Sequence, residues 1–201
     1  MRLRPGHVLV NGALAVLSAA TLFPLAWMLM ASLMAPGEAS QFPPPLWPKS
    51  PSLANYRQLF EAHGIARQAA NSLAVAVAAT LLSLAFNLSA GYAFAKLPFA
   101  GRERLFRALL GALVIPGQVA MMPLFLLLKQ MGLVNTYAGA LVPWLASVFG
   151  IFLVRQYAQG IPDDLLEAAR IDGAGEWRIF TAIVLPLLKP IIVTLAVLVF
   201  L

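Results

Sequence analysis

Four long stretches of this sequence contain no charged residue, and they restrict the possible folds more than any other feature. They cover residues 8–35, 69–95, 108–128 and 130–154. Each has at least the roughly 20 helical residues that cross a hydrocarbon core of about 30 Å. A charged side chain at the centre of such a helix would cost about 2.5 to 3.5 kcal/mol, so its absence from all four is informative. The stretches therefore predict four complete membrane-spanning helices.

The composition indicates that the bilayer is the solvent of this chain. Of the 201 residues, 61% are apolar and only 11% are charged, whereas soluble domains carry about 25% charged residues. The stretches lack the two-residue alternation of a membrane β-barrel, and a helix satisfies its backbone polar groups internally. We predict an all-α fold, a polytopic transmembrane helical bundle, over the alternative of buried helices in a large soluble core.

The distribution of basic residues predicts the orientation of the chain. With the amino terminus on the cytoplasmic side, ten basic residues lie inside and four outside, as the positive-inside rule requires. The ten are Arg2, Arg4, Lys96, Arg102, Arg104, Arg107, Arg155, Arg170, Arg178 and Lys189, and the four are Lys49, Arg57, Arg67 and Lys129. We interpret the net charge of +6 as a topology signal in a protein whose environment is membrane lipid, not nucleic acid. The first stretch exceeds the roughly 7 to 15 residues of a signal-peptide core, so we expect an uncleaved span.

Three regions follow from this topology. They are a cytoplasmic tail with the first span (1–35), an outer loop (36–68) and a core domain (69–201). Five prolines between Pro43 and Pro51 favour an ordered or semi-rigid loop. A short helix is predicted over residues 53–66.

The second and third apolar stretches carry packing signals. Small residues in the second stretch predict a helix that contacts others, because close backbone packing drives helix association in lipid. Within it, Asn87 is interpreted as a packing residue in preference to a substrate contact. Pro116 and Pro123 interrupt the third stretch and predict kinks. Broken helices mark transport paths in some membrane proteins, but a simple packing kink is an equal alternative.

A charged segment at residues 163–180 contrasts with its apolar surroundings and holds five of the eight acidic residues. Pro162 and the acidic pair after it suit a helix start, and Gly173 suits the helix end. Glu167 and Arg170 are close enough to pair on this helix of about ten residues. One side presents Leu165, Ala168, Ala169 and Asp172. Since so short a helix is marginal alone, the helix, glycine turn and second helix require a partner; the alternative is a solvated connector.

The same segment carries a resemblance to a known family. Glu167-Ala168-Ala169, followed by Gly173 and then Leu185-Pro186, resembles the EAA loop of the membrane subunits of ABC importers that use a substrate-binding protein. The fuller segment IPDDLLEAARIDGAGEWRIFTAIVLPLLKP is most similar to the sugar-uptake branch, in particular to the second permease subunit of the maltose system. Further matching pieces span nearly the whole chain: Asn55-Tyr56, Asn71-Ser72, Tyr92-Ala93-Phe94-Ala95, Pro123-Leu124-Phe125 and Asn135-Thr136.

This resemblance implies a bacterial inner-membrane permease of about six spans that forms a heterodimer with a second permease subunit. It also implies two ATP-binding subunits on the cytoplasmic side and an extracellular or periplasmic substrate-binding protein. Residues 155–190 would form the coupling loop to the ATPase. The docking residues implied by the motif are Glu167, Ala168, Ala169 and Gly173, with Arg170 and Asp172 as helpers.

Signatures of catalysis are missing from the sequence. It contains no phosphate-binding GxxxxGK[ST] loop, so ATP hydrolysis is assigned to a partner and the chain is predicted not to be an enzyme. His7 and His63 stand apart from other ligand residues and there is no cysteine, so we expect no metal site and no cofactor. A membrane enzyme would need paired ionisable groups within the spans, and a passive channel would not need the charged segment.

The family pattern extends beyond residue 201, through the end of a fifth span and a sixth. Residues 191–201 provide only about 16 Å of helix, too little to cross the bilayer. We therefore expect a truncated fifth span in a truncated or partial product that assembles poorly. The open alternatives are an importer of the same class for an amino acid, peptide or polyol phosphate, and a non-functional truncated permease. The sequence identifies neither the solute nor the substrate-contacting residues.

Overall fold

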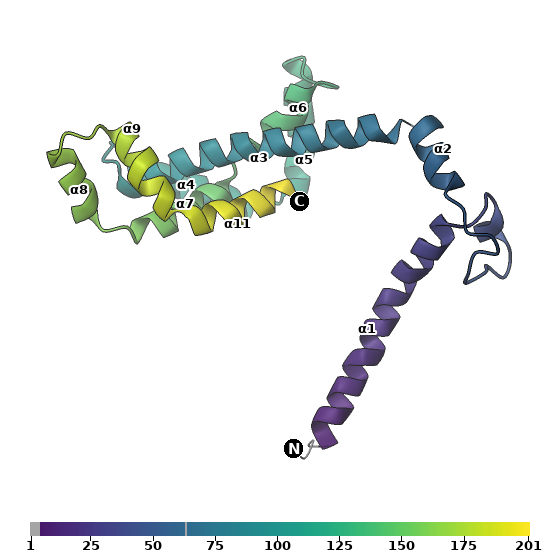
Figure 1. Ribbon diagram of the computed structural model, residues 1–201. Helices are drawn as coiled ribbons and strands as arrows, with labels where there is room; N and C mark the ends of the chain where they lie inside the picture. Colours follow the sequence, from purple (N-terminus) through teal and green to yellow (C-terminus); the bar gives the residue numbers. More distant parts are fainter. Residues whose placement is uncertain (1–4, 63) are drawn as a thin grey trace. The chain divides into compact units, whose positions relative to one another are not determined.

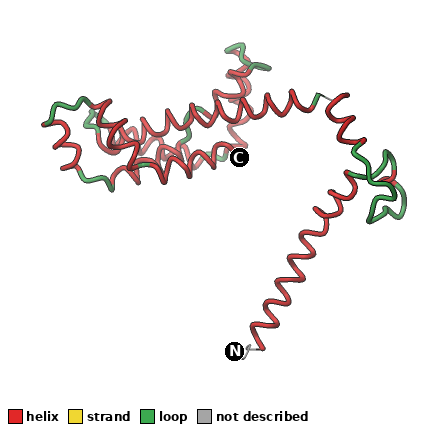
Figure 2. Tube along the Cα trace, viewed as in Figure 1, coloured by secondary structure: helices red, strands yellow, loops and turns green. Residues whose placement is uncertain are grey.

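The structure, a computed structural model, describes residues 5–62 and 64–201, except for the side chains of residues 5–8. The described residues form helices and connecting loops, with no strand among them (Figure 2). This confirms the predicted all-α fold. The chain divides into two compact units, Met1–Ala70 and Asn71–Leu201.

The first unit consists of helices and an ordered loop. Its elements are α1 (Pro5–Ser32), the short 3₁₀ helix η1 (Glu38–Ser40), α2 (Ala54–Ala62) and the first turn of α3 (Ile65–Lys96). The loop is held by Glu38, which is buried and accepts hydrogen bonds from the backbone N–H groups of Ala35 (3.1 Å) and Lys49 (2.8 Å). The predicted helix over 53–66 forms a shorter α2, and Gly64 follows with φ +59°.

The second unit contains the rest of α3 and all later helices. These are α4 (Arg102–Gly111), η2 (Ala112–Val114), α5 (Gly117–Gln130), α6 (Tyr137–Leu141), η3 (Val142–Trp144), α7 (Val148–Gln159), α8 (Asp163–Ile171), α9 (Glu176–Ile179), the π-helix η4 (Phe180–Val184), α10 (Leu185–Leu187) and α11 (Lys189–Phe200). Figure 1 shows α9 and α11 beside the second half of α3, with α8 at the end of the unit. The core between these helices consists of Leu88, Tyr92, Val154, Ala158, Ile161, Leu166, Ile179, Phe180, Val184, Leu188, Ile191 and Leu195.

Among the described residues, two helices are long and apolar enough to cross a membrane unbroken, and up to five spans result if each of three bent helix pairs counts as one. The unbroken helices are α1 over Leu9–Ser32 and α3, so the first two predicted spans form continuous helices. The bent pair Glu176–Leu187 and Lys189–Phe200, with an angle of 80°, contains the expected fifth span.

The third predicted span, 108–128, is not one helix. Its residues lie in the bent pair Arg102–Val114 and Gly117–Gln130, whose two parts meet at 105°. Ile115 has extended backbone (φ −80°, ψ 115°) because the ring of Pro116 disfavours the helical conformation in the residue before it. The proline predicted a kink, and the structure contains a complete break.

The fourth predicted span, 130–154, is also wrong as a single helix. Its first residues belong to the end of α5 and a turn, and the remainder forms the pair Tyr137–Trp144 and Val148–Gln159, bent by 44°. Ser147 separates the two parts and caps α7 by accepting a hydrogen bond from the N–H of Gly150 (2.9 Å). A new helix start within an uncharged stretch leaves no trace in hydrophobicity, which explains the error.

Candidate functional site

The charged segment forms a short helix with defined ends. Helix α8 has nine residues, with Asp163 and Asp164 in its first turn, where they stabilise the positive end of the helix dipole. At its end, Gly173 takes φ +81°, as predicted. The N–H of Gly173 donates to the carbonyl of Arg170 (3.0 Å) and that of Ala174 to the carbonyl of Ala169 (2.9 Å). This pattern is a Schellman motif, in which the glycine reverses the chain at little steric cost.

Helix α8 has a packed side and an exposed side. Leu166 is 1% exposed, and Ala169 packs against the same core. The other residues predicted for docking are exposed: Glu167, Ala168, Arg170, Asp172 and Gly173. These residues therefore remain accessible to a partner while Leu166 holds the helix in place.

Lys96, at the end of α3, fixes the start of α8. Its side chain is 6% exposed and its Nζ lies 2.6 Å from the Asp163 carboxylate. The same Nζ donates to the carbonyl of Ile161 (2.6 Å). The hydrogen bond from Lys96, reinforced by its charge, lowers the pKa of Asp163 below its usual value. A charge-assisted bond of this kind is stronger than a neutral one.

Glu176, the first residue of α9, fixes the other end of α8. One carboxylate oxygen lies 2.6 Å from Nε of Arg170, and the other accepts a hydrogen bond from the Tyr92 hydroxyl (3.1 Å). The ion pair of Arg170 forms with Glu176, which the reversal at Gly173 brings to it. The hydrogen bond to Glu176 raises the pKa of Arg170, and the charge of Glu167 helps to raise it. The predicted proximity of Arg170 to Glu167 agrees with this contribution.

Both anchors come from one face of α3. Tyr92 and Lys96 are four residues apart, so they lie above one another on that helix. Through Glu176 and Asp163 they hold both ends of α8 against the end of α3. Sequence reasoning missed these residues as site residues. Two signals were present: Tyr92 begins the matching piece Tyr92-Ala93-Phe94-Ala95, and Lys96 is the charge that ends the second apolar stretch.

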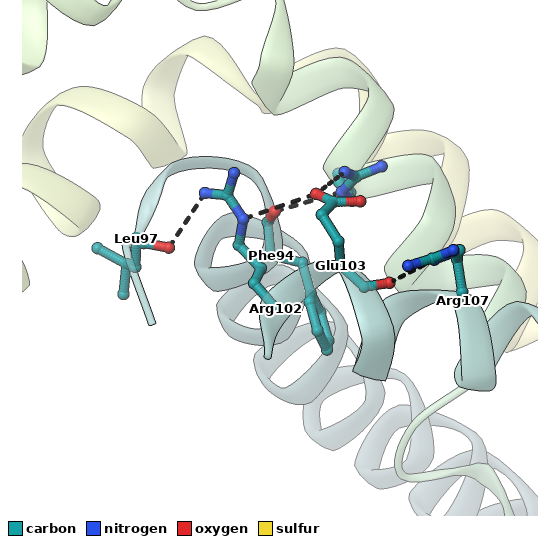
Figure 3. A network of polar contacts seen from close by, with 6 residues as sticks. Phe94, Leu97, Arg102, Glu103 and Arg107 are labelled. Carbon is teal, nitrogen blue, oxygen red and sulfur yellow. Dashed lines mark hydrogen bonds and ion pairs between the residues drawn. The ribbon is translucent and has the colours of Figure 1, made fainter. Parts of the chain in front are cut away.

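A second polar cluster joins α4, α7 and α3. The side chain of Arg155 is 11% exposed, and its guanidinium lies 2.8 Å from the Glu103 carboxylate. It also donates to the carbonyl of Phe94 (3.2 Å) and lies 4.0 Å from the ring centre of Phe106, which adds a cation–π contact. Figure 3 shows Phe94 and Glu103 within this cluster.

Asn87 lies at the break before α7 and is 1% exposed. Its amide donates to the Ser83 hydroxyl (2.8 Å), and its carbonyl oxygen accepts from the N–H of Ser147 (3.0 Å). The structure thus places it in a packing and capping role. Within the described residues no group of three or more acidic or histidine side chains is arranged to hold a metal ion; His7 and His63 lie outside the described side chains.

Comparison with known proteins agrees with this architecture. Residues 88–201 match the family described as the binding-protein-dependent transport system inner membrane component. The chain belongs to this family. It is therefore a multi-pass membrane protein of a family of inner-membrane transport components. The matched region includes α8 and the two α3 residues that hold it, Tyr92 and Lys96.

Among the relatives of this chain are sugar transport proteins. It is 41% identical over 64% of its length to the arabinooligosaccharides transport system permease protein AraQ of Halalkalibacterium halodurans, covering 46% of that protein. It is 38% identical over 87% of its length to AraQ of Bacillus subtilis, covering 63% of that protein. It is 33% identical over 90% of its length to the diacetylchitobiose uptake system permease protein NgcG of Streptomyces coelicolor, covering 61% of that protein. The chain thus spans about half to two thirds of these curated relatives.

A solved structure supports the fold of the chain. The whole chain aligns with a TM-score of 0.87 and 24% identity to 72% of a chain in the crystal structure of a bacterial ABC transporter involved in the import of the acidic polysaccharide alginate. At this identity the likeness shows the fold.

Proposed function

We propose that this chain is the membrane-spanning permease subunit of an ATP-driven importer that moves a sugar across the bacterial inner membrane. The observation that carries the proposal is the way in which α8 is held. Its start is bonded to Lys96 of α3, and its end is linked through Glu176 of α9 to Tyr92 of α3, while its other side is exposed. Relatives whose names state arabinooligosaccharide or diacetylchitobiose transport support the choice of a sugar.

The proposed partners follow from the resemblance to importer permeases. A second permease subunit would complete the translocation path, and a substrate-binding protein would deliver the solute from outside. Two ATP-binding subunits would hydrolyse ATP on the cytoplasmic side, where the amino terminus and α8 would also lie. Glu167, Ala168 and Asp172 would contact the ATPase, and Gly173 would set the direction of the turn beside it.

In this proposal α8 transmits the motion of the ATPase to the spans. A ligand shifts a conformational equilibrium only through contacts that differ between the two states. ATP-driven closure would displace α8, and the bonds of Lys96 to Asp163 and of Tyr92 to Glu176 would pass the displacement to α3. Hydrolysis would reverse it, so that packed helices rock between two openings.

Docking is tested by Glu167→Lys in the importer assembled with its other subunits. We expect co-purification of the ATPase to fall about tenfold, since one interfacial contact changes from favourable to repulsive charge. The matched control is Glu61→Lys, which also changes an exposed glutamate on a nine-residue helix, α2. Equal loss of the ATPase in both variants, or in neither, would reject docking through Glu167.

Transmission is tested separately by Lys96→Met. We expect the ATPase to remain bound, because Lys96 is covered and does not face the partner, while uptake of the sugar falls about tenfold, as expected when a coupling contact worth 1 to 3 kcal/mol is lost. Lys129→Met is the control, since Lys129 is also the basic residue in the last turn of a helix, α5. Normal uptake with Lys96→Met would show that the motion takes another route.

A solute other than a sugar is the second candidate, and the relatives give a specific reason for it. The chain is 32% identical over 89% of its length to the sn-glycerol-3-phosphate transport system permease protein UgpE of Rhizobium meliloti. A polyol phosphate carries charge that a neutral sugar lacks. A binding screen on the partner substrate-binding protein, with arabinooligosaccharides and glycerol 3-phosphate as ligands, separates the two candidates.

A further inference from the structure

The loop between α3 and α4 forms a surface cavity of about 920 Å³ that the proposed coupling mechanism does not use. Three arginines line it, Arg102, Arg104 and Arg107, together with Phe99 and Glu103. Figure 3 shows Leu97 at the start of this loop and Arg102, Glu103 and Arg107 along the helix that follows it, α4. Such a concentration of guanidinium groups favours an anionic ligand.

The positive charge of the cavity is not neutralised from within. Its one carboxylate, Glu103, is shared by two guanidinium groups through the same oxygen, at 2.8 Å from Arg155 and 3.7 Å from Arg102. Arg102 and Arg107 otherwise donate to backbone carbonyls, those of Leu97 (3.2 Å) and Glu103 (3.3 Å) respectively. Arg104 has no hydrogen-bond or ion-pair partner in the described part of the chain and is exposed.

The surroundings of the cavity distinguish a lipid from a small soluble anion. Phe99 lies in the cavity and is 40% exposed, and Leu105, next to Arg104, is 56% exposed. Helix α4 then continues into the apolar η2, where Val114 is 82% exposed. A phospholipid carries a phosphate, which would contact the arginines, and an acyl chain, which would cover the neighbouring apolar residues. Inorganic phosphate would leave these apolar residues uncovered. Basic groups at a membrane surface attract anionic lipids.

We propose that this cavity binds the headgroup phosphate of an anionic phospholipid, with Arg102, Arg104 and Arg107 as its ligands. In the predicted topology the lipid belongs to the cytoplasmic leaflet. The phosphate oxygens accept hydrogen bonds from the guanidinium groups, which match their geometry. Glu103 remains bound to Arg155, so the lipid also covers the cluster that joins α4 to α7.

Native mass spectrometry of the purified protein, titrated in detergent with phosphatidylglycerol or phosphatidylcholine, tests the site. We expect phosphatidylglycerol to bind with higher affinity. The apparent Kd should rise about fivefold in Arg104→Gln and about a hundredfold in the triple variant Arg102→Gln, Arg104→Gln, Arg107→Gln, if the three contributions add. Because Arg104 is exposed and has no polar partner among the described residues, its single variant tests the site even if the triple variant unfolds.

The matched control removes the same number of positive charges elsewhere, in Arg57→Gln, Arg67→Gln, Lys129→Gln, and should leave the Kd unchanged. An equal loss of affinity for phosphatidylglycerol in both triple variants would show that only the net charge of the protein matters, and it would overturn the proposal. Equal affinity for phosphatidylcholine would overturn it, as would displacement of phosphatidylglycerol by millimolar inorganic phosphate. Unchanged lipid binding with loss of the ATPase in the Arg102, Arg104 and Arg107 triple variant would assign the surface to a protein partner instead.

Discussion

Helices α1 and α3 share length and apolar character but differ in what they bury. They have 28 and 32 residues, and both are long and apolar enough to cross a membrane. None of the described side chains of α1 is buried, whereas α3 buries Ala79, Thr80, Ser83, Asn87, Leu88, Gly91 and Tyr92. Five of these seven are small or polar. Hydrophobicity therefore does not decide which of the two helices buries side chains within its own unit.

The difference follows from the physics of the bilayer. Lipid tails are as apolar as leucine, so apolar surface alone gives two helices no reason to associate. Small residues let backbones approach, as at Gly91, where an added Cβ would overlap the side chain of Val154. Polar residues then add hydrogen bonds, as Asn87 does to Ser83 and Ser147. Helix α1 offers large apolar side chains such as Leu17 and Phe23, 63% and 58% exposed, for lipid or for another subunit.

The largest effect is expected from Gly91→Leu, which breaks the close contact of α3 with α7. A leucine there has to displace the buried Val154. Overpacking of this kind costs about 1 to 3 kcal/mol, and we expect the upper end because the side chain meets a β-branched neighbour. Unfolding of the purified protein in mixed micelles, titrated with dodecyl sulfate, measures the change.

The matched control for this substitution is Gly12→Leu in α1. No described atom lies within 4 Å of the position where a Cβ on Gly12 would stand. We expect this variant to unfold at the same dodecyl sulfate concentration as the parent. Similar destabilisation in both variants would mean that the loss in Gly91→Leu does not come from the contact of α3 with Val154.

A smaller effect is expected from Asn87→Ala, which removes a polar contact and leaves the rest of α3 intact. The N–H of Ser147 loses its acceptor next to the start of α7. An unsatisfied buried group costs about 1 to 3 kcal/mol, so the same titration should show a loss of about 2 kcal/mol. Asn11→Ala in α1 is the control, since Asn11 is exposed. If Asn87→Ala is as stable as the parent, the break before α7 is held by other contacts.

Much of this architecture was predictable because each signal is local. The length of the uncharged stretches predicted α1 and α3. Pro162 and Gly173 correctly predicted where α8 begins and ends. The positions that resemble the EAA loop lie on one short helix, with Glu167 and Ala168 exposed. Their role in docking stays a prediction.

The errors arose where a contact depends on a chain reversal or on the crossing of two helices, and not on spacing within one helix. The spacing rule for helices paired Arg170 with Glu167, but the turn at Gly173 offers Arg170 the closer Glu176. The break before α7 depends on Ser147, whose N–H is bonded by Asn87, 60 residues earlier. Neither contact can be predicted from the periodicity of one helix. The first depends on the chain reversal at Gly173, and the second depends on the packing of α3 against the start of α7.

The smallest effect concerns the carboxylates beside the ends of the two helices. Near the end of α1, hydrogen bonds from the backbone N–H groups of Lys49 and Ala35 lower the pKa of Glu38 from its usual 4.5. At the end of α3, Lys96 lowers the pKa of Asp163 from its usual 3.8. A carboxyl group whose pKa is lowered by folding stabilises the protein above its unfolded pKa, and this stability is lost as the pH falls through the folded pKa.

Thermal unfolding between pH 7 and pH 3 should therefore separate the parent from Glu38→Gln and Asp163→Asn only at the higher pH values. The difference should shrink below about pH 4.5 for Glu38 and below about pH 3.8 for Asp163. We expect Glu38→Gln to have the larger effect, because Glu38 is 6% exposed while the Asp163 side chain is 74% exposed and its pair is screened by water. A difference that stays constant down to pH 3 would show that shape, not charge, holds these helix ends. In that case the small residues that α3 buries, and that the described part of α1 does not, would be the only difference between the two helices that affects stability.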